Sequence, residues 1–270
     1  MGPLHEHQRP SLTVVGLGEA LFDCFPSRQV LGGAPLNLAY HADQLLHAHR
    51  GRGVVVSRVG EDSLGQELRR ELAVRGLTRE FVQSDASLPT GQVRVEISSS
   101  AEPVYQVVSP VAWDHLRFES SLAELSRSCR AVCFGSLAQR AAASRETIQR
   151  FLREATQAIR CFDVNLRPPF VESDVLRSSL QLATVAKLNA EELGQVCQLL
   201  KLTVRGSCVA DGAQAIREAF GLHAVAVTRG AAGTQLHLAD RIIEGQVPHY
   251  ASLANGDAVG AGDACCAGLL

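Results

Sequence analysis

The sequence predicts a three-layer α/β/α fold around a mostly parallel central sheet. Short apolar runs typical of buried strands alternate with longer amphipathic stretches typical of helices, as in chains built from βαβ units. Within this series, segments 90–97 and 104–108 flank a Ser-rich turn and predict an antiparallel hairpin. A hairpin inside a strand–helix series indicates a small β-sheet lid, with strands at about 20–32 and 90–109.

Size and composition favour one domain. The chain has 270 residues, of which 46% are hydrophobic, so we expect a single domain over residues 11–270 that follows a flexible polar tail, 1–10. A formal charge of −2 argues against nucleic acid as a partner. No apolar run approaches a membrane span, so no membrane partner is expected. Eight cysteines without CxxC pairs indicate reduced thiols and a cytoplasmic location.

The elements follow in order along the chain. Glycines and prolines bound the apolar runs, and capping candidates precede the amphipathic stretches. Segment 19–23 is expected to continue the first strand, and Trp113 to serve in packing. The predicted strands are 12–18, 53–60, 131–135, 161–167, 183–189, 224–228 and the hairpin return 234–238, and the predicted helices are 36–47, 62–75, 144–159 and one that begins near residue 189.

The last stretch, 257–263, carries the strongest chemical signal. Gly260, Ala261 and Gly262 let the backbone approach a ligand, and the amides of the helix that follows favour an anion. The carboxylate of Asp263 beside these amides suits phosphoryl transfer, because it can accept a proton from an attacking hydroxyl. The alternative is a tight turn in which Asp263 only begins a helix.

Residues after the first strand form a second candidate site. Asp23 can accept hydrogen bonds from sugar hydroxyls, because ligands bind at the carboxyl ends of strands in α/β sheets. Gly32 and Gly33 permit close approach of the backbone, and Asn37 lies in the first turn of a helix. A solvated loop acid and an ordinary turn remain alternatives.

Polar residues after the later strands indicate a phosphate and nucleotide region. Arg167 is the basic group expected near a phosphate, unless it is a plain surface residue. Asn189 and Glu192 fit either a capping box or a magnesium site, and the two roles are compatible. Three further residues border a nucleotide or form a simple β-turn: Thr228, Gly230 and Gly233.

Six motifs occur in one order along the chain, and together they resemble the ribokinase, or PfkB, family of carbohydrate kinases over residues 13–270. Each motif is weak by itself, whereas six in the family's order are specific. They are GGAPLN at 32–37, RVGEDSLG at 58–65, DVNLR at 163–167, KLNAEE at 187–192, VTRGAAG at 227–233 and DAVGAGD at 257–263. Within the family, the first and third motifs look most like those of fructokinases.

The resemblance implies a ribokinase-like fold and an ATP-dependent sugar kinase. By the resemblance, Asp263 is the catalytic base, and the amides of Gly260, Ala261 and Gly262 form an anion hole. The implied sugar contacts are Asp23, Gly32, Gly33, Asn37 and Arg167, and the implied ATP contacts are Asn189, Thr228, Gly230, Gly233 and Asp257. The family implies Mg²⁺, held with the help of Glu192, leaves K⁺ open as a further cofactor, and makes a homodimer through the lid an expected assembly.

Two departures from the family pattern keep alternatives open. Ala258 replaces a threonine that the family usually carries, and the chain ends at Leu270, seven residues after Asp263, so we expect a shortened C-terminal helix. One alternative is a catalytically silent protein that binds sugar without using ATP. The other is a kinase whose acceptor is 2-keto-3-deoxygluconate, ribose or a nucleoside.

Overall fold

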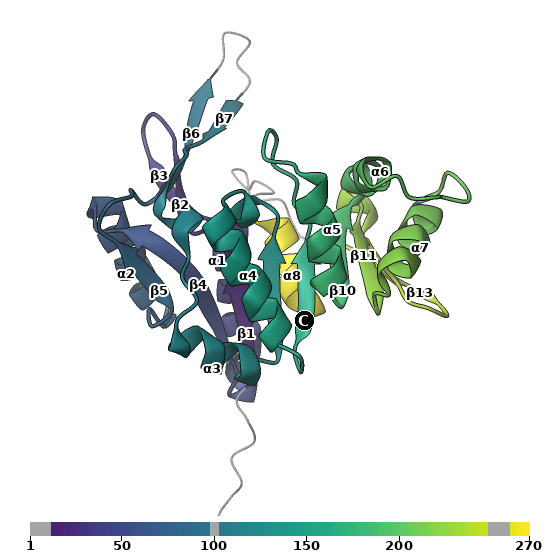
Figure 1. The fold of residues 1–270 in the computed structure, drawn as a ribbon, viewed down its shortest axis with the longest axis horizontal. Coiled ribbons are helices and arrows are strands. Elements are labelled where there is room, and N and C mark those ends of the chain that lie inside the picture. Colours follow the sequence, from purple (N-terminus) through teal and green to yellow (C-terminus); the bar gives the residue numbers. More distant parts are fainter. Residues whose placement is uncertain (1–11, 98–102, 248–259) are drawn as a thin grey trace, which may run out of the picture.

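The computed structural model describes residues 12–97, 103–247 and 260–270, and a nine-stranded sheet dominates it (Figure 1). The strand order is β13-β12-β11-β10-β9-β8-β1-β4-β5, in which the pairs from β5 to β11 are parallel and the last two are antiparallel. The strands are β1 Thr13–Leu17, β4 Arg52–Gly60, β5 Val82–Asp85, β8 Ala131–Gly135, β9 Ile159–Asp163, β10 Val185–Asn189, β11 Ala224–Thr228, β12 Thr234–His237 and β13 Ile242–Gly245.

Helices pack on both faces of this sheet, as the prediction of an α/β/α fold requires. α1, α2 and α8 pack on one face, and α3 to α7 pack on the other. The α-helices are α1 Ala34–Leu46, α2 Ser63–Val74, α3 Ser120–Ser128, α4 Ala142–Glu154, α5 Ser173–Leu182, α6 Ala190–Leu199, α7 Val209–Phe220 and α8 Ala261–Leu269, and the short 3₁₀ helices are η1 His47–His49, η2 Ala112–His115, η3 Leu137–Gln139 and η4 Gly230–Ala232. The three-layer fold is thereby confirmed.

Successive side chains of a strand point to opposite faces of the sheet, and this alternation builds the two layers of the core. In β8, Val132 and Phe134 pack in the layer beneath α3 to α7, whereas Cys133 packs in the layer beneath α1 and α8. Phe134 stacks on Phe162 of β9 with ring centroids 5.2 Å apart. Because every side chain of a central strand is buried in one layer or the other, the strands read as continuous apolar runs.

A separate four-stranded sheet has the order β3-β2-β6-β7, and we call it the lid after the prediction from the sequence. It consists of β2 Leu21–Cys24, β3 Gln29–Gly32, β6 Gly91–Ile97 and β7 Pro103–Val107. Figure 1 shows the β6–β7 hairpin projecting away from the main sheet. The predicted hairpin is present, with β6 and β7 antiparallel, and the buried Trp113 packs at its base against Gly91.

Three predicted boundaries are wrong. The chain leaves the main sheet at Gly18, where φ is 149°, so segment 19–23 does not continue β1 but enters the lid. Strand β9 ends at Asp163 and not at residue 167, because Asn165 adopts a left-handed φ of 39° that no strand allows. Helix α4 ends at Glu154, and β9 already begins at Ile159, where the sequence predicts the last residue of the helix.

Local signals at other element ends are confirmed. Asp62 caps α2 by accepting a hydrogen bond from the amide of Gly65, and Asn189 begins α6 in a capping box.

Among the described residues, no helix is long and apolar enough to span a membrane.

Candidate active site

A cavity of about 740 Å³ lies between the lid and the carboxyl ends of the main-sheet strands. This edge is where ligands bind in open α/β sheets. Segments from most of the chain line the cavity: Glu19, Leu21, Asp23, Gly33, Ala34, Asn37, Val93, Val107, Leu137, Asp163, Asn165, Leu166, Arg167, Pro168, Lys187, Asn189, Glu192, Thr228, Gly260, Gly262 and Asp263.

Asp263 lies in the first turn of α8 and faces this cavity. Asn37, in the first turn of α1, donates a hydrogen bond from Nδ2 to Asp263 Oδ2 at 2.9 Å. Burial raises the pKa of Asp263 above its ordinary value, whereas the hydrogen bond from Asn37 and the charge of Lys187 oppose this shift. A carboxylate with a raised pKa, fixed at one oxygen, is suited to accept a proton.

A buried ion pair supports the floor of the cavity. Lys187 Nζ donates to both carboxylate oxygens of Asp163, at 3.0 and 2.9 Å. Burial would lower the pKa of Lys187, but the attraction of Asp163 outweighs it and the pKa lies above its ordinary value. A Cβ at Gly262 would lie 3.2 Å from Lys187 Nζ, so the ammonium sits close to the first turn of α8.

Glu19 is a second buried acid on the cavity wall. Only 4% of the residue is exposed, and its Oε2 has no hydrogen-bond partner among the described residues. Burial raises the pKa of Glu19 from 4.5 to about 7, and the nearby charges of Arg167 and Arg140 lower it only in part. This side chain is therefore ready to change its protonation near neutral pH.

Three helices begin at the cavity. Gly33 caps α1, Asn189 caps α6 and Gly260 caps α8, and all three residues line the cavity. The first amides of a helix lack partners within the helix and carry the positive end of its dipole. Their convergence on one cavity favours an anionic group such as a phosphate.

Glu192 joins the start of α6 to the loop after β9. Its Oε2 accepts a hydrogen bond from the amide of Asn189 at 2.9 Å, and its Oε1 accepts one from the amide of Leu166 at 2.8 Å. The side chain of Asn189 accepts in turn from the amide of Glu192 at 2.8 Å. The capping role is therefore present in the structure, and each carboxylate oxygen keeps a further lone pair.

The comparisons with known proteins decide the family. The profile of the pfkB family carbohydrate kinase matches residues 18–270. The chain belongs to this family of carbohydrate kinases. A fructokinase from Klebsiella pneumoniae is 31% identical over 94% of the chain and 82% of its own length. The family's members are phosphotransferases, so the predicted resemblance and enzyme class are confirmed.

Solved pfkB kinases share the fold. The sugar kinase PH1459 from Pyrococcus horikoshii is 26% identical, with a TM-score of 0.78 over 96% of this chain and 83% of that one. The same kinase has been solved in complex with ATP, with a TM-score of 0.76 and 25% identity over the same shares of the two chains. A fructokinase from Xylella fastidiosa with bound ATP has a TM-score of 0.78 at 24% identity, over 95% of this chain and 80% of that one, which supports the fold.

Most residues that the family motifs single out meet at the cavity. Those that line it are Asp23, Gly33, Asn37, Arg167, Asn189, Glu192, Thr228, Gly260, Gly262 and Asp263. Burial raises the pKa of Asp23, and Arg167, an exposed residue at the rim, opposes this shift. The motifs therefore come together in one site, although they are spread over the whole chain.

Four predicted residues lie outside the cavity lining. Gly32 lies behind Asp23, where a Cβ would meet the Asp23 Oδ2 at 2.9 Å, and Ala261 is exposed at the start of α8. Gly230 and Gly233 lie in the turn after β11, away from the cavity lining. Asp257 lies outside the described residues.

Sequence reasoning missed three charged residues of the lining: Glu19, Asp163 and Lys187. Each stands in or beside a predicted strand, so a signal was available, since strand ends meet at one edge of a parallel sheet. Only the fold shows that Asp163 and Lys187 pair across β9 and β10.

Proposed function

We propose that this chain is an ATP-dependent sugar kinase that transfers the γ-phosphate of ATP to a hydroxyl of fructose or a closely similar sugar. The observation that carries the proposal is the position of Asp263. Its carboxylate lies in a cavity, in the first turn of α8, and is held by Asn37 at 2.9 Å. This arrangement places a proton acceptor beside helix amides that favour a phosphate.

Asp263 acts as the general base in this proposal. The sugar hydroxyl attacks the γ-phosphorus, its O–H bond breaks as the new O–P bond forms, and the proton passes to Asp263. The bond between the γ-phosphorus and the β-γ bridging oxygen breaks, and ADP leaves. The amides of Gly260, Ala261 and Gly262 stabilise the charge on the transferred group, and the nearby Lys187 adds a positive charge.

The lid side of the cavity suits a sugar. Asp23 of β2 and Asn37 of α1 offer hydrogen-bonding groups, and the apolar Leu21, Val93 and Val107 can cover a sugar ring. Arg167 at the rim, Gly32 and Gly33 complete the proposed sugar subsite. Closure of the lid over the sugar would exclude water from the phosphoryl group.

The opposite side of the cavity suits ATP. The proposed contacts are Asn189, Thr228, Gly230, Gly233 and Asp257. Mg²⁺ fits the free lone pairs of Glu192 through its own water ligands, because magnesium usually keeps several waters and takes few protein ligands. When bound, Mg²⁺ would neutralise part of the phosphate charge.

A screen of ADP release tests the proposal. Fructose, ribose, 2-keto-3-deoxygluconate and adenosine are compared as acceptors, each with and without K⁺. We expect the highest kcat/KM with fructose. Calorimetry on the same chain distinguishes a kinase from a silent sugar-binding protein. If sugar binding releases heat but no acceptor leads to ADP release, the kinase is contradicted and the silent protein is favoured. A higher kcat/KM with another acceptor would contradict only the choice of sugar.

A cytoplasmic homodimer belongs to the same proposal. The eight cysteines are free, as is usual for reduced cytoplasmic proteins. In the described part of the lid, β3 and β7 are edge strands, and Val30 of β3 is 41% exposed. Exposed edge strands pair readily with a second copy. Sedimentation equilibrium should show a dimer that Val30→Glu shifts toward monomer, and a parent chain that sediments as a monomer would contradict the assembly.

A further inference from the structure

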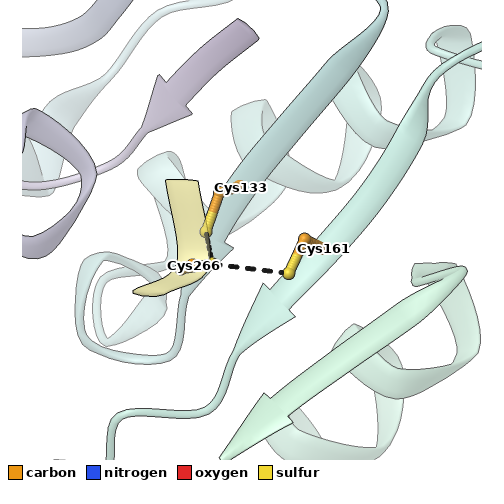
Figure 2. Close-up of side chains that lie close together, drawn as sticks. All are labelled: Cys133, Cys161 and Cys266. Carbon is orange, nitrogen blue, oxygen red and sulfur yellow. Dashed lines mark hydrogen bonds between the residues drawn. The ribbon is translucent and has the colours of Figure 1, made fainter. Parts of the chain in front are cut away.

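Three cysteines from distant parts of the chain meet beneath α8. Figure 2 shows Cys133 of β8 and Cys161 of β9 pointing toward Cys266 of α8. The Cys266 Sγ lies 3.6 Å from the Cys133 Sγ and 3.7 Å from the Cys161 Sγ, and all three sulfurs lie within 4.8 Å of one another. Each of the three residues is at most 4% exposed.

The spacing of the sulfurs matches the geometry of a metal ion. A point equidistant from three sulfurs at these separations lies no more than about 2.4 Å from each, and a metal–thiolate bond is about 2.3 Å long. An ion could therefore sit near the plane of the three sulfurs without movement of the backbone. Packing of three cysteines for bulk alone does not require all three sulfurs to converge on one point.

The number of ligands decides the kind of ion. Among the described residues, the group that could share one ion consists of three sulfurs, with no imidazole or carboxylate. Thiolates bind both zinc and copper(I), but structural zinc takes four protein ligands in a tetrahedron, and three thiolates leave it one ligand short. The three sulfurs therefore favour copper(I). The neighbours Val14, Leu38 and Ala267 are buried and apolar. The carboxylate of Asp163 acts on the cluster electrostatically, but Lys187 holds both of its oxygens and it does not belong to the group that could share one ion.

We propose that Cys133, Cys161 and Cys266 form a three-thiolate site for one copper(I) ion. On binding, three S–H bonds break, three Cu–S bonds form, and the protons pass to solvent while copper stays in the +1 state. The ammonium of Lys187, which pairs with Asp163, also attracts the Cys266 thiolate. Cys266 stands three residues after Asp263 on α8, so the ion would fix the helix that carries the proposed base.

A titration of the full chain with copper(I), in competition with a coloured copper(I) chelator, tests this site. The background variant Cys24→Ser/Cys208→Ser/Cys265→Ser removes the three cysteines that are not buried. We expect this variant to keep one copper(I) per chain. Cys133→Ala and Cys161→Ala in the same background should each weaken retention at least tenfold, whereas Cys129→Ala, a buried cysteine outside the cluster, should not.

Two further measurements test the proposal without the cluster variants, in case one of these fails to fold. X-ray absorption of the copper-loaded background chain should show three sulfurs around copper, and two sulfurs would overturn the site. The midpoint of thermal unfolding should rise with copper(I), because the ion binds the folded chain, and a fall would show binding to the unfolded chain instead. Equal retention by Cys161→Ala and the background chain would also overturn it.

Discussion

Two features of the Asp263 side chain shift its pKa in opposite directions. It is largely buried, which raises its pKa, yet Asn37 holds it by a hydrogen bond that favours the charged form. The carboxylate therefore binds a proton more strongly than an ordinary aspartate does, which suits the proposed role as a base. Activity should therefore fall as the pH drops through this raised pKa.

Asp263→Asn should lower kcat by on the order of 10² to 10⁴, because the amide cannot accept the proton of the hydroxyl. The Kd of the sugar should change little, since the two side chains have the same shape. Rapid-quench assays give kcat and calorimetry gives the Kd. Asp240→Asn, at an exposed residue remote from the cavity lining, is the matched control and should leave kcat unchanged. Undiminished turnover in Asp263→Asn would refute its role as the base.

Glu19 makes the stability of the chain depend on pH. In the folded chain burial raises its pKa to about 7, against 4.5 in the unfolded chain. Below pH 4.5 Glu19 is protonated in both the folded and the unfolded chain, and its contribution to the free energy of unfolding is complete. Between these values unfolding releases the proton, so the free energy of unfolding decreases as the pH rises, by about 3 kcal/mol in total.

Glu19→Gln should remove this dependence, because glutamine does not titrate. The difference in unfolding free energy between variant and parent should grow in favour of the variant from pH 5 to pH 8. Urea unfolding at each pH measures it. Glu80→Gln changes an exposed glutamate and serves as the control. A difference that stays constant over this range would show that Glu19 does not titrate as expected.

The sequence predicts the chemistry of single residues better than their environment. Asp263 and Asn37 are both recognisable from their motifs, but the hydrogen bond between them joins residues 226 positions apart. The raised pKa of Glu19 likewise follows from burial and from the charges of residues far along the chain, such as Arg140 and Arg167, which no local pattern encodes. The surroundings of a side chain depend on contacts between segments that are distant in the chain, and a single sequence does not show these contacts directly.

At the scale of elements, the start of each helix at the cavity depends on a specific residue. Gly33 caps α1 with φ 110°, and a Cβ there would lie 2.5 Å from the carbonyl oxygen of Glu19. Gly260 caps α8 with φ 81°. Left-handed and close-packed positions of this kind favour glycine. The loops before α1 and α8 are therefore shaped by glycine so that the amides reach the cavity.

Gly33→Ala should destabilise the chain by about 1–3 kcal/mol, because the new methyl group clashes with Glu19 and the backbone conformation is strained. Thermal or urea unfolding measures the loss. Gly194→Ala is the matched control, because Gly194 lies inside α6 with open space around its Cα, and it should be neutral or stabilise by up to about 1 kcal/mol. Equal effects of the two substitutions would argue against strain at Gly33.

Periodicity predicts the existence of elements, whereas their ends depend on tertiary contacts. The capping box at Asn189 and the cap at Asp62 could be predicted, because their partners lie three residues away. The end of β9 could not, because it follows from the turn at Asn165 that the Glu192 carboxylate holds through Leu166. Helices α3, α5 and α7 are not among the elements predicted from the sequence, although apolar residues recur at helical spacing in each.

At the scale of the molecule, the cavity joins two parts that belong to different sheets. Leu21, Asp23 and Val93 reach it from the lid, whereas Asn189 and Thr228 reach it from the ends of β10 and β11. Asp263 lies in α8, which packs beside α1, and it lines the same cavity. In the proposed reaction, this division lets the two substrates contact different segments and meet at Asp263.

Hydrogen exchange should therefore report the two substrates separately. Fructose should slow exchange in the lid strands β2, β3 and β6, and a non-hydrolysable ATP analogue should slow it at the start of α6 and in the turn after β11. In segments that open only when the ligand has left, amide hydrogen exchange should slow by up to about 100-fold at a ligand concentration of 100 times the Kd. Mass spectrometry of peptic peptides measures this, and α3, on the opposite face of the sheet from α8, serves as the internal control. If the ATP analogue protected the lid strands and fructose protected α6, the assignment of the two ends of the cavity would be reversed.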